Sequence, residues 1–163
     1  MWQQELVIVL RALIDDLFPP QLYEDADLQQ IILVAAQLSS PEAKSFSQVY
    51  TIDVDQLQLT PDPTESPKDN AFITLVSLKA ACILDMAEAR KAGTQAYSFK
   101  EGTSAADLRG IADARLKFMK EGYCKQYSEA LLEYLSTGQI VGAAITTPVR
   151  INGLTNASSY SYR

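Results

Sequence analysis

The side chains of this sequence whose spacing could support chemistry are carboxylates. Asp53 and Asp55 lie two positions apart in a stretch of alternating apolar and polar residues. On a β-strand they would point to the same face, roughly 7 Å from each other. Together with Asp62 they could hold a hard divalent cation, which prefers oxygen ligands. An exposed polar strand face predicts the same residues, and we prefer this second interpretation.

Lys79 is the second candidate, because it lies in the most apolar segment of the chain. A buried lysine with a lowered pKa can act as a nucleophile. More commonly the stem of such a lysine lies along apolar surface and its ammonium group reaches water or an acid. We expect this second arrangement.

The sequence contains no histidine, which is the commonest general base and metal ligand. It also contains no glycine-rich phosphate loop, no dinucleotide fingerprint and no Cys-x-x-Cys pair. We therefore expect a protein that is not an enzyme, with no catalytic residue, no cofactor and no metal site.

Cys82 and Cys124 lie in helical patterns and lack the dense spacing of a secreted disulfide framework. We therefore expect both cysteines to be reduced and buried, in a protein of the cytosol. The first twenty residues carry acids among their apolar positions, and we expect no apolar run of the roughly 20 residues that a membrane span needs. The sequence therefore predicts neither export nor contact with a membrane.

The composition of the 163 residues is that of an ordinary folded domain, with 47% hydrophobic and 21% charged residues. Acids outnumber bases by 20 to 14, which gives a net charge of −6. No run of lysine and arginine could follow a phosphate backbone. Tight binding of nucleic acid is therefore not expected.

Apolar residues recur at helical spacing in four segments. Pro19 and Pro20 are expected to end the first helix, Asp25 to cap the second, and Asp69 and Gly93 to begin and end the third. The fourth, if unbroken, would be about 48 Å long. The predicted helices span 2–17, 25–41, 69–93 and about 105–136.

Residues 49–59 alternate in polarity and predict a short strand or hairpin. The proline-rich segment 60–67 follows, and we expect it to be an extended, solvated loop. Pro61, Asp62 and Pro63 are its candidate contact residues.

Tyr123, Tyr127 and Tyr134 form a stripe at helical spacing, which is typical of a core or of an interface between subunits. We assign them to a subunit interface and leave the core as the alternative.

After Gly138 the sequence has no acid and its apolar residues are scattered among Gly, Thr, Ser and Asn. We expect an extended arm that becomes ordered on a partner by pairing with a sheet edge or filling a groove. The alternative is a strand packed on its own domain. The candidate arm contacts are Ile145, Val149, Arg150, Ile151, Leu154, Tyr160 and Tyr162.

The predicted fold is therefore mainly α: a bundle of about four helices including one long helix, with a small β-hairpin and an extended C-terminal arm. Residues 1–138 form the helical body and residues 139–163 form the arm.

Five strings of the sequence can be compared with known families: residues 23–32, 50–53, 59–63, 72–82 and 102–109. In their order and spacing they resemble the head-to-tail connector proteins of tailed phages, which are also called adaptor or head-completion proteins. The resemblance covers roughly residues 20–135.

The resemblance implies a structural protein of the virion neck that is assembled in the host cytoplasm. It implies a ring, commonly of twelve copies, that extends the DNA channel beneath the portal protein, presents a surface to the next neck or tail component and grips the portal with its arm. Double-stranded DNA would pass through the ring without tight binding. An acidic lumen would keep DNA from adhering during passage.

The alternative is a helical regulatory module or a binding module associated with DNA packaging. Salt-sensitive binding of DNA would favour that alternative.

Overall fold

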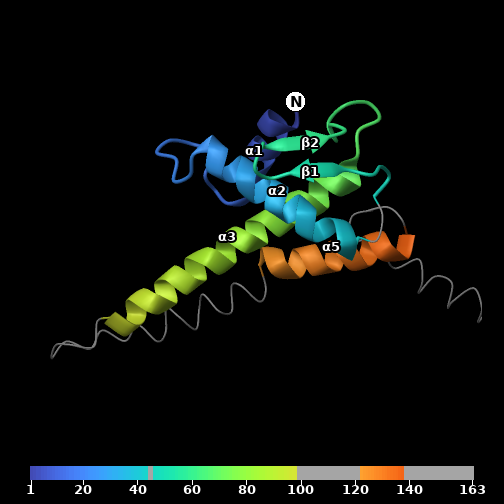
Figure 1. The fold of residues 1–163 in the computed structure, drawn as a ribbon. Coiled ribbons are helices and arrows are strands. Elements are labelled where there is room, and N and C mark those ends of the chain that lie inside the picture. Colours follow the sequence, from blue (N-terminus) through green and yellow to red (C-terminus); the bar gives the residue numbers. More distant parts are fainter. Residues whose placement is uncertain (44–45, 99–121, 138–163) are drawn as a thin grey trace, which may run out of the picture.

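The computed structural model describes residues 1–43, 46–98 and 122–137, with the backbone alone for residues 92–98. This part of the chain contains four α-helices and one antiparallel pair of short strands (Figure 1). The prediction of a mainly helical fold with a small hairpin is confirmed. In chain order the elements are α1 (Trp2–Leu13), α2 (Asp25–Glu42), β1 (Thr51–Asp53), β2 (Gln58–Thr60), α3 (Asn70–Ser98) and α5 (Tyr123–Thr137).

Helix α1 ends at Leu13, well before the two prolines that were predicted to end it. Asp15 has a φ of 58°, a left-handed conformation that aspartate tolerates better than most residues. The next amide, from Asp16, donates to the carbonyl of Arg11 at 2.9 Å, as in a Schellman-type helix end. Leu17 consequently lies in an exposed loop and not on the apolar face of the helix.

Helix α2 has Glu24 at its N-cap position, without a hydrogen bond from the side chain. The predicted cap, Asp25, is instead the first helical residue, and its carboxylate binds Arg11. Asp25 and Asp27 place negative charge in the first turn, where the helix dipole favours it.

Helix α3 starts where the sequence predicted. Asp69 is its N-cap, since Asp69 Oδ1 accepts the amide N–H of Phe72 at 3.0 Å. The helix does not end at Gly93 but continues to Ser98. With 29 residues it is about 43 Å long, which makes α3 the longest helix among the described residues. In Figure 1 its C-terminal half projects beyond the other helices.

The hydrophobic core forms where α1, α2 and the hairpin pack on the N-terminal half of α3. A smaller cluster packs α5 against α3 and the end of α2. It consists of Ala43, Leu75, Tyr127 and Tyr134. Full burial of one large apolar side chain stabilises the fold by roughly 1.5–3 kcal/mol, so the two clusters hold the elements together. The largest buried side chains of the main cluster include Leu6, Leu10, Leu28, Ile32, Phe72 and Val76.

Residues Asn70–Lys91 of α3 are long and apolar enough to cross a membrane, contrary to the expectation that no segment would be. More than half of the most apolar part of this segment is buried inside the protein. The same length and composition characterise a central helix that is covered by neighbouring helices on several sides. This is the role of α3, which packs against α1, α2 and α5.

The predicted hairpin is present, with Ile52 paired opposite Leu59 in an antiparallel register. Asp53 lies in β1, and its carboxylate accepts the N–H of Gln56 at 2.9 Å within the turn. Asp55 belongs to that turn and not to a strand. The two aspartates therefore do not form the same-face strand pair that the alternation predicted.

Helix α5 begins at Tyr123, directly after Gly122. The Gly122 carbonyl accepts the amides of Lys125 and Gln126, each at 3.1 Å, as at the start of a helix. A single unbroken helix over 105–136 is therefore wrong at Gly122. The predicted residues before it, 105–121, lie outside the described residues.

Cys82 and Cys124 form a disulfide that joins the middle of α3 to the first turn of α5. The prediction that both are reduced is corrected. The two helices pack side by side, which brings the Cα atoms to 4.7 Å, within the range of a disulfide. A separation of 42 residues in the sequence gives no sign of this proximity.

Candidate functional site at the α1–α2 corner

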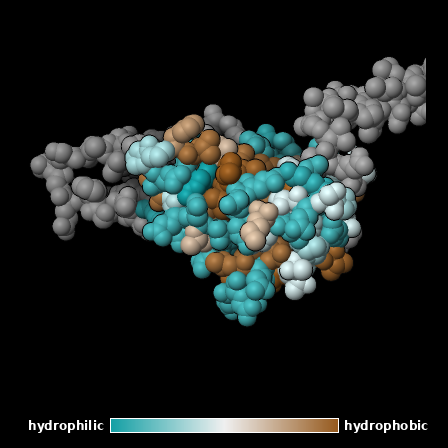
Figure 2. All heavy atoms as spheres, turned by 90° about the horizontal axis from the view of Figure 1, so that it is seen from above, coloured by the Kyte–Doolittle hydropathy of each residue, from teal (hydrophilic) through white to brown (hydrophobic). Residues whose placement is uncertain are grey.

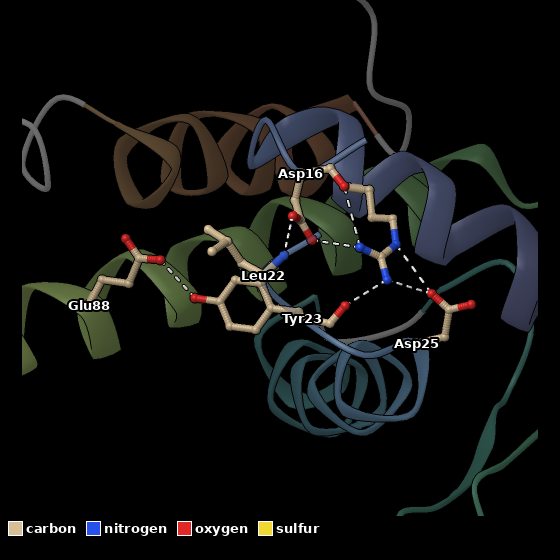
Figure 3. A network of polar contacts seen from close by, with 6 residues as sticks. Asp16, Leu22, Tyr23, Asp25 and Glu88 are labelled. Atoms are coloured by element: carbon tan, nitrogen blue, oxygen red, sulfur yellow. Dashed lines mark hydrogen bonds and ion pairs between the residues drawn. The ribbon is translucent and has the colours of Figure 1, made fainter. Parts of the chain in front are cut away.

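The loop between α1 and α2, residues 14–24, is held by one buried arginine. Arg11 projects from the last turn of α1. Its Nη1 donates to Asp16 Oδ2 at 2.5 Å and to the Asp16 carbonyl at 3.3 Å. Its Nη2 donates to the carbonyl of Tyr23 at 2.8 Å and to Asp25 Oδ1 at 2.6 Å (Figure 3). One side chain thus fixes both ends of this segment, which we call the corner loop.

Asp16 provides the remaining contacts of this network. While its Oδ2 binds Arg11, its Oδ1 accepts the amide N–H of Leu22 at 2.7 Å. Asp16 is itself buried, so both carboxylate oxygens are satisfied inside the protein. A buried charge pair is stable only with such complete partners, because each ion has lost its hydration.

The corner loop presents apolar side chains to solvent although its backbone is fixed. Phe18 is 79% exposed and Leu22 is 80% exposed. In Figure 3 the Leu22 side chain points away from the buried network. Exposed apolar groups on a fixed backbone are typical of a protein interaction site, because little conformational entropy is lost on binding. The apolar tip consists of Leu17, Phe18, Pro19, Pro20 and Leu22.

The surroundings of the apolar tip are acidic. No lysine or arginine occurs between Ala12 and Ala43. The acids of this stretch that lie in or next to the corner loop and have exposed side chains are Asp15, Glu24, Asp25 and Asp27. The nearest base, Arg11, is already paired with Asp16 and Asp25. The corner is therefore an apolar tip with an acidic rim.

Tyr23 connects this corner to α3. Its hydroxyl donates to Glu88 Oε1 at 2.7 Å. Burial, and then this hydrogen bond, raise the pKa of Tyr23 to about 12. Burial and the neighbouring Glu88 also raise the pKa of Asp85 on the same helix. The rim of carboxylates thus extends from the corner loop along α3.

Other apolar side chains are exposed outside the corner, so the surface is not uniformly polar. Figure 2, which looks at the molecule from above relative to Figure 1, shows apolar residues scattered among hydrophilic ones. Large exposed examples are Ile8, Leu38, Val49, Leu132 and Leu135. Single exposed apolar residues are common on proteins, whereas the fixed group at the corner is not.

The predicted contact loop is corrected in part. Pro61 is exposed, but the ring of Pro63 is fully buried. Asp62 accepts the Trp2 amide at 2.9 Å and both the amide and the hydroxyl of Thr64, at 2.9 and 2.7 Å. Burial alone would raise the pKa of Asp62, but these hydrogen bonds outweigh it and the pKa is lowered. The loop packs on α1 because Asp62 holds the start of that helix.

The three tyrosines assigned to a subunit interface contact other parts of their own chain. Tyr127 and Tyr134 are buried, and Tyr123 is half-buried with its hydroxyl donating to the Leu13 carbonyl. The hydroxyl of Tyr127 donates to Glu42, and burial followed by this bond raises the pKa of Tyr127. The alternative interpretation, a core position, therefore holds for Tyr127 and Tyr134.

Lys79 has the structural role that was expected. Its ammonium group binds the two carboxylate oxygens of Glu42 at 3.0 and 3.1 Å and lies 4.4 Å from the centre of the Tyr127 ring. Burial would raise the pKa of Glu42, but the bonds from Tyr127 and Lys79 lower it.

The carboxylates considered for a cation are not gathered into one site. Within 1–43, 46–98 and 122–137, no group of three or more His, Cys, Asp or Glu side chains is placed to hold a metal ion. Asp53 is engaged in its turn and Asp62 at the start of α1. The arm contacts Ile145, Val149, Arg150, Ile151, Leu154, Tyr160 and Tyr162 lie outside the described residues.

The Arg11 network was not predicted from the sequence. One signal was available: Arg11 follows Val7 by four residues, so it shares the buried side of a helix with Val7, and Asp15 and Asp16 come four and five residues after it. A basic residue on an apolar face needs an acidic partner. That requirement points to a buried ion pair at the end of α1.

In comparisons with models of protein families, with curated proteins and with solved structures, nothing matches this chain.

Proposed function

We propose that this chain is a structural assembly protein that acts by binding other proteins and not by catalysis. Its place would be that of a head-to-tail connector in the neck of a tailed phage. Copies of the chain would form a ring, commonly of twelve, beneath the portal protein and extend the DNA channel. The next neck or tail component would bind the far side of the ring.

The observation that carries this proposal is the corner loop. A buried ion pair and several hydrogen bonds fix its backbone, and the fixed backbone holds Phe18 and Leu22 in solvent. Exposing such side chains costs solubility and contributes nothing to the fold of a single chain. A binding partner that covers them would account for the arrangement.

The polar side chains that were considered for chemistry support the same proposal. Lys79 is bound to Glu42, Asp62 to the start of α1, and Asp53 to the turn of the hairpin. Each of these groups has a structural partner that occupies the atoms a reaction would need. The projecting half of α3 adds an elongated surface beyond the packed body (Figure 1).

The proposal is tested by measuring the mass of the full-length protein in solution, alone and with the portal protein of the same virus. We expect a complex in which several copies are bound to one portal ring. A protein that fails to bind the portal at micromolar concentration would contradict the connector function. Retention of DNA at low salt, lost as salt is raised, would favour the packaging-associated alternative.

A further inference from the structure

The corner loop offers a surface for which the chain itself contains a suitable binding partner. The surface is an apolar tip surrounded by acids, without a free base in the loop. Its partner should therefore be apolar and carry positive charge but no negative charge. This requirement can be compared directly with the composition of residues 139–163.

The arm meets this requirement. Between Gln139 and Arg163 the sequence has no aspartate and no glutamate, and its two charged residues are Arg150 and Arg163. Arg150 lies between Val149 and Ile151, so a positive charge is flanked by apolar side chains. The two segments are complementary both in charge and in apolar character.

The geometry favours an arm that reaches another copy. In Figure 1 α5 ends on the right of the described body, whereas the corner loop lies on the left, above the projecting half of α3. The 26 residues after Thr137 span up to about 85 Å when extended, at about 3.3 Å per residue. The arm is thus long enough to reach a neighbour, and it leaves the body at the end remote from the chain's own corner.

We propose that the arm of one copy, residues 139–163, binds the corner loop of a neighbouring copy. Apolar arm residues pack on Phe18 and Leu22, and Arg150 faces the acidic rim. The contact joins two different surfaces, so it repeats from copy to copy and builds a ring or a filament. This inference rests on the proposed function only because both require that copies associate. It assigns the arm to a neighbouring copy and not to the portal protein.

Two full-length variants test the proposal, because each removes one side of the contact. Phe18→Asp with Leu22→Asp alters the corner and leaves the arm intact, and both side chains are exposed, so the fold is preserved. Val149→Asp with Ile151→Asp alters the arm and leaves the corner intact. We expect the unmodified protein to gain mass with concentration in sedimentation velocity, and each variant alone to stay a monomer.

Mixing the two variants is the decisive measurement. One functional contact remains in the mixture, between the intact arm of one variant and the intact corner of the other. We therefore expect a 1:1 dimer of twice the monomer mass and no larger species. A mixture that stays monomeric while the unmodified protein associates would overturn the proposal.

Binding can be measured directly with a labelled peptide of residues 139–163. The peptide is titrated with the variant that carries Val149→Asp and Ile151→Asp, because the altered arm of this variant does not compete with the peptide. We expect the corner substitutions to weaken peptide binding by at least about tenfold, because two apolar contacts are lost. Arg150→Glu in the peptide should weaken binding most at low salt. The control is Val49→Asp, since Val49 is 92% exposed in the connection between α2 and β1 and should have no effect.

The outcomes separate this inference from the connector function. Portal binding without any peptide binding would overturn the inference and leave the function standing. If the peptide binds and the mixed variants form a dimer, but the protein does not bind the portal, the inference is supported and the connector function is contradicted. An unmodified protein that is monomeric at every concentration would show that copies do not associate through the arm, and would overturn the inference.

Discussion

The Arg11 guanidinium lies 2.5 Å from Asp16 Oδ2, and the two side chains are only 5% and 3% exposed. Asp16 follows Arg11 by five positions, and the end of α1 at Leu13 and the left-handed Asp15 lie between them. The ion pair therefore connects the last turn of α1 to the start of the corner loop. Its removal should affect both the stability of the protein and the shape of the loop.

Arg11→Met should lower the free energy of unfolding by about 3–5 kcal/mol, because it leaves the Asp16 carboxylate buried without its ionic partner. Urea denaturation at pH 7 measures this loss. The matched control is Lys68→Met, which removes a largely exposed pair with Glu5 and should cost less than about 1 kcal/mol. Equal losses in the two variants would mean that the Arg11 network does not hold the corner.

Reduction of the Cys82–Cys124 disulfide should lower the free energy of unfolding by about 4 kcal/mol, since the bond closes a loop of 42 residues in the unfolded chain. Urea denaturation with and without a dithiol reductant measures the difference. The variant Cys82→Ser with Cys124→Ser serves as the control and should not respond to the reductant. Two titratable thiols in the native, air-oxidised protein would contradict the bond.

The state of the two cysteines was predicted wrongly from the sequence, for a physical reason. The disulfide depends on the packing of α5 along α3, which is tertiary information that the spacing of Cys82 and Cys124 does not contain. The same packing turned Tyr127 and Tyr134 from interface candidates into core residues. Long-range contacts of this kind account for both of these wrong predictions.

Local signals were more reliable. Asp69 at the start of α3 was predicted because an N-cap acts on amides within three residues. The hairpin was predicted because alternation has the period of a strand. The end of α1 was missed because a left-handed Asp15 is set by the backbone, whereas the more conspicuous Pro19 and Pro20 lie beyond it.

The hydroxyl of Tyr23 should ionise near pH 12 in the folded protein, because burial and the bond to Glu88 favour its neutral form. The folded pKa lies above the unfolded value of 10.0, so the stabilising contribution is complete below pH 10 and is lost as pH rises toward 12. Tyrosinate absorbance near 295 nm follows this titration. Tyr23→Phe should remove an absorbance transition near pH 12. If it removes a transition near pH 10 instead, the hydrogen bond between Tyr23 and Glu88 is contradicted.

Asp62→Asn tests the link between the proline-rich loop and α1. The carboxylate accepts hydrogen bonds from Trp2 and Thr64, and an amide in its place accepts them less strongly. We expect the free energy of unfolding to fall by about 1–3 kcal/mol at pH 7, as measured by urea denaturation.

The effect of Asp62 should depend on pH. Because the folded pKa of Asp62 lies below its ordinary 3.8, its contribution is present above pH 3.8 and disappears as pH falls through the folded pKa. The difference between Asp62→Asn and the unmodified protein should therefore shrink as the pH falls below 3.8, whereas the exposed control Glu65→Gln should show little difference at neutral or at acidic pH. A loss that stays constant down to pH 2 would assign the effect to packing and not to the charge of Asp62.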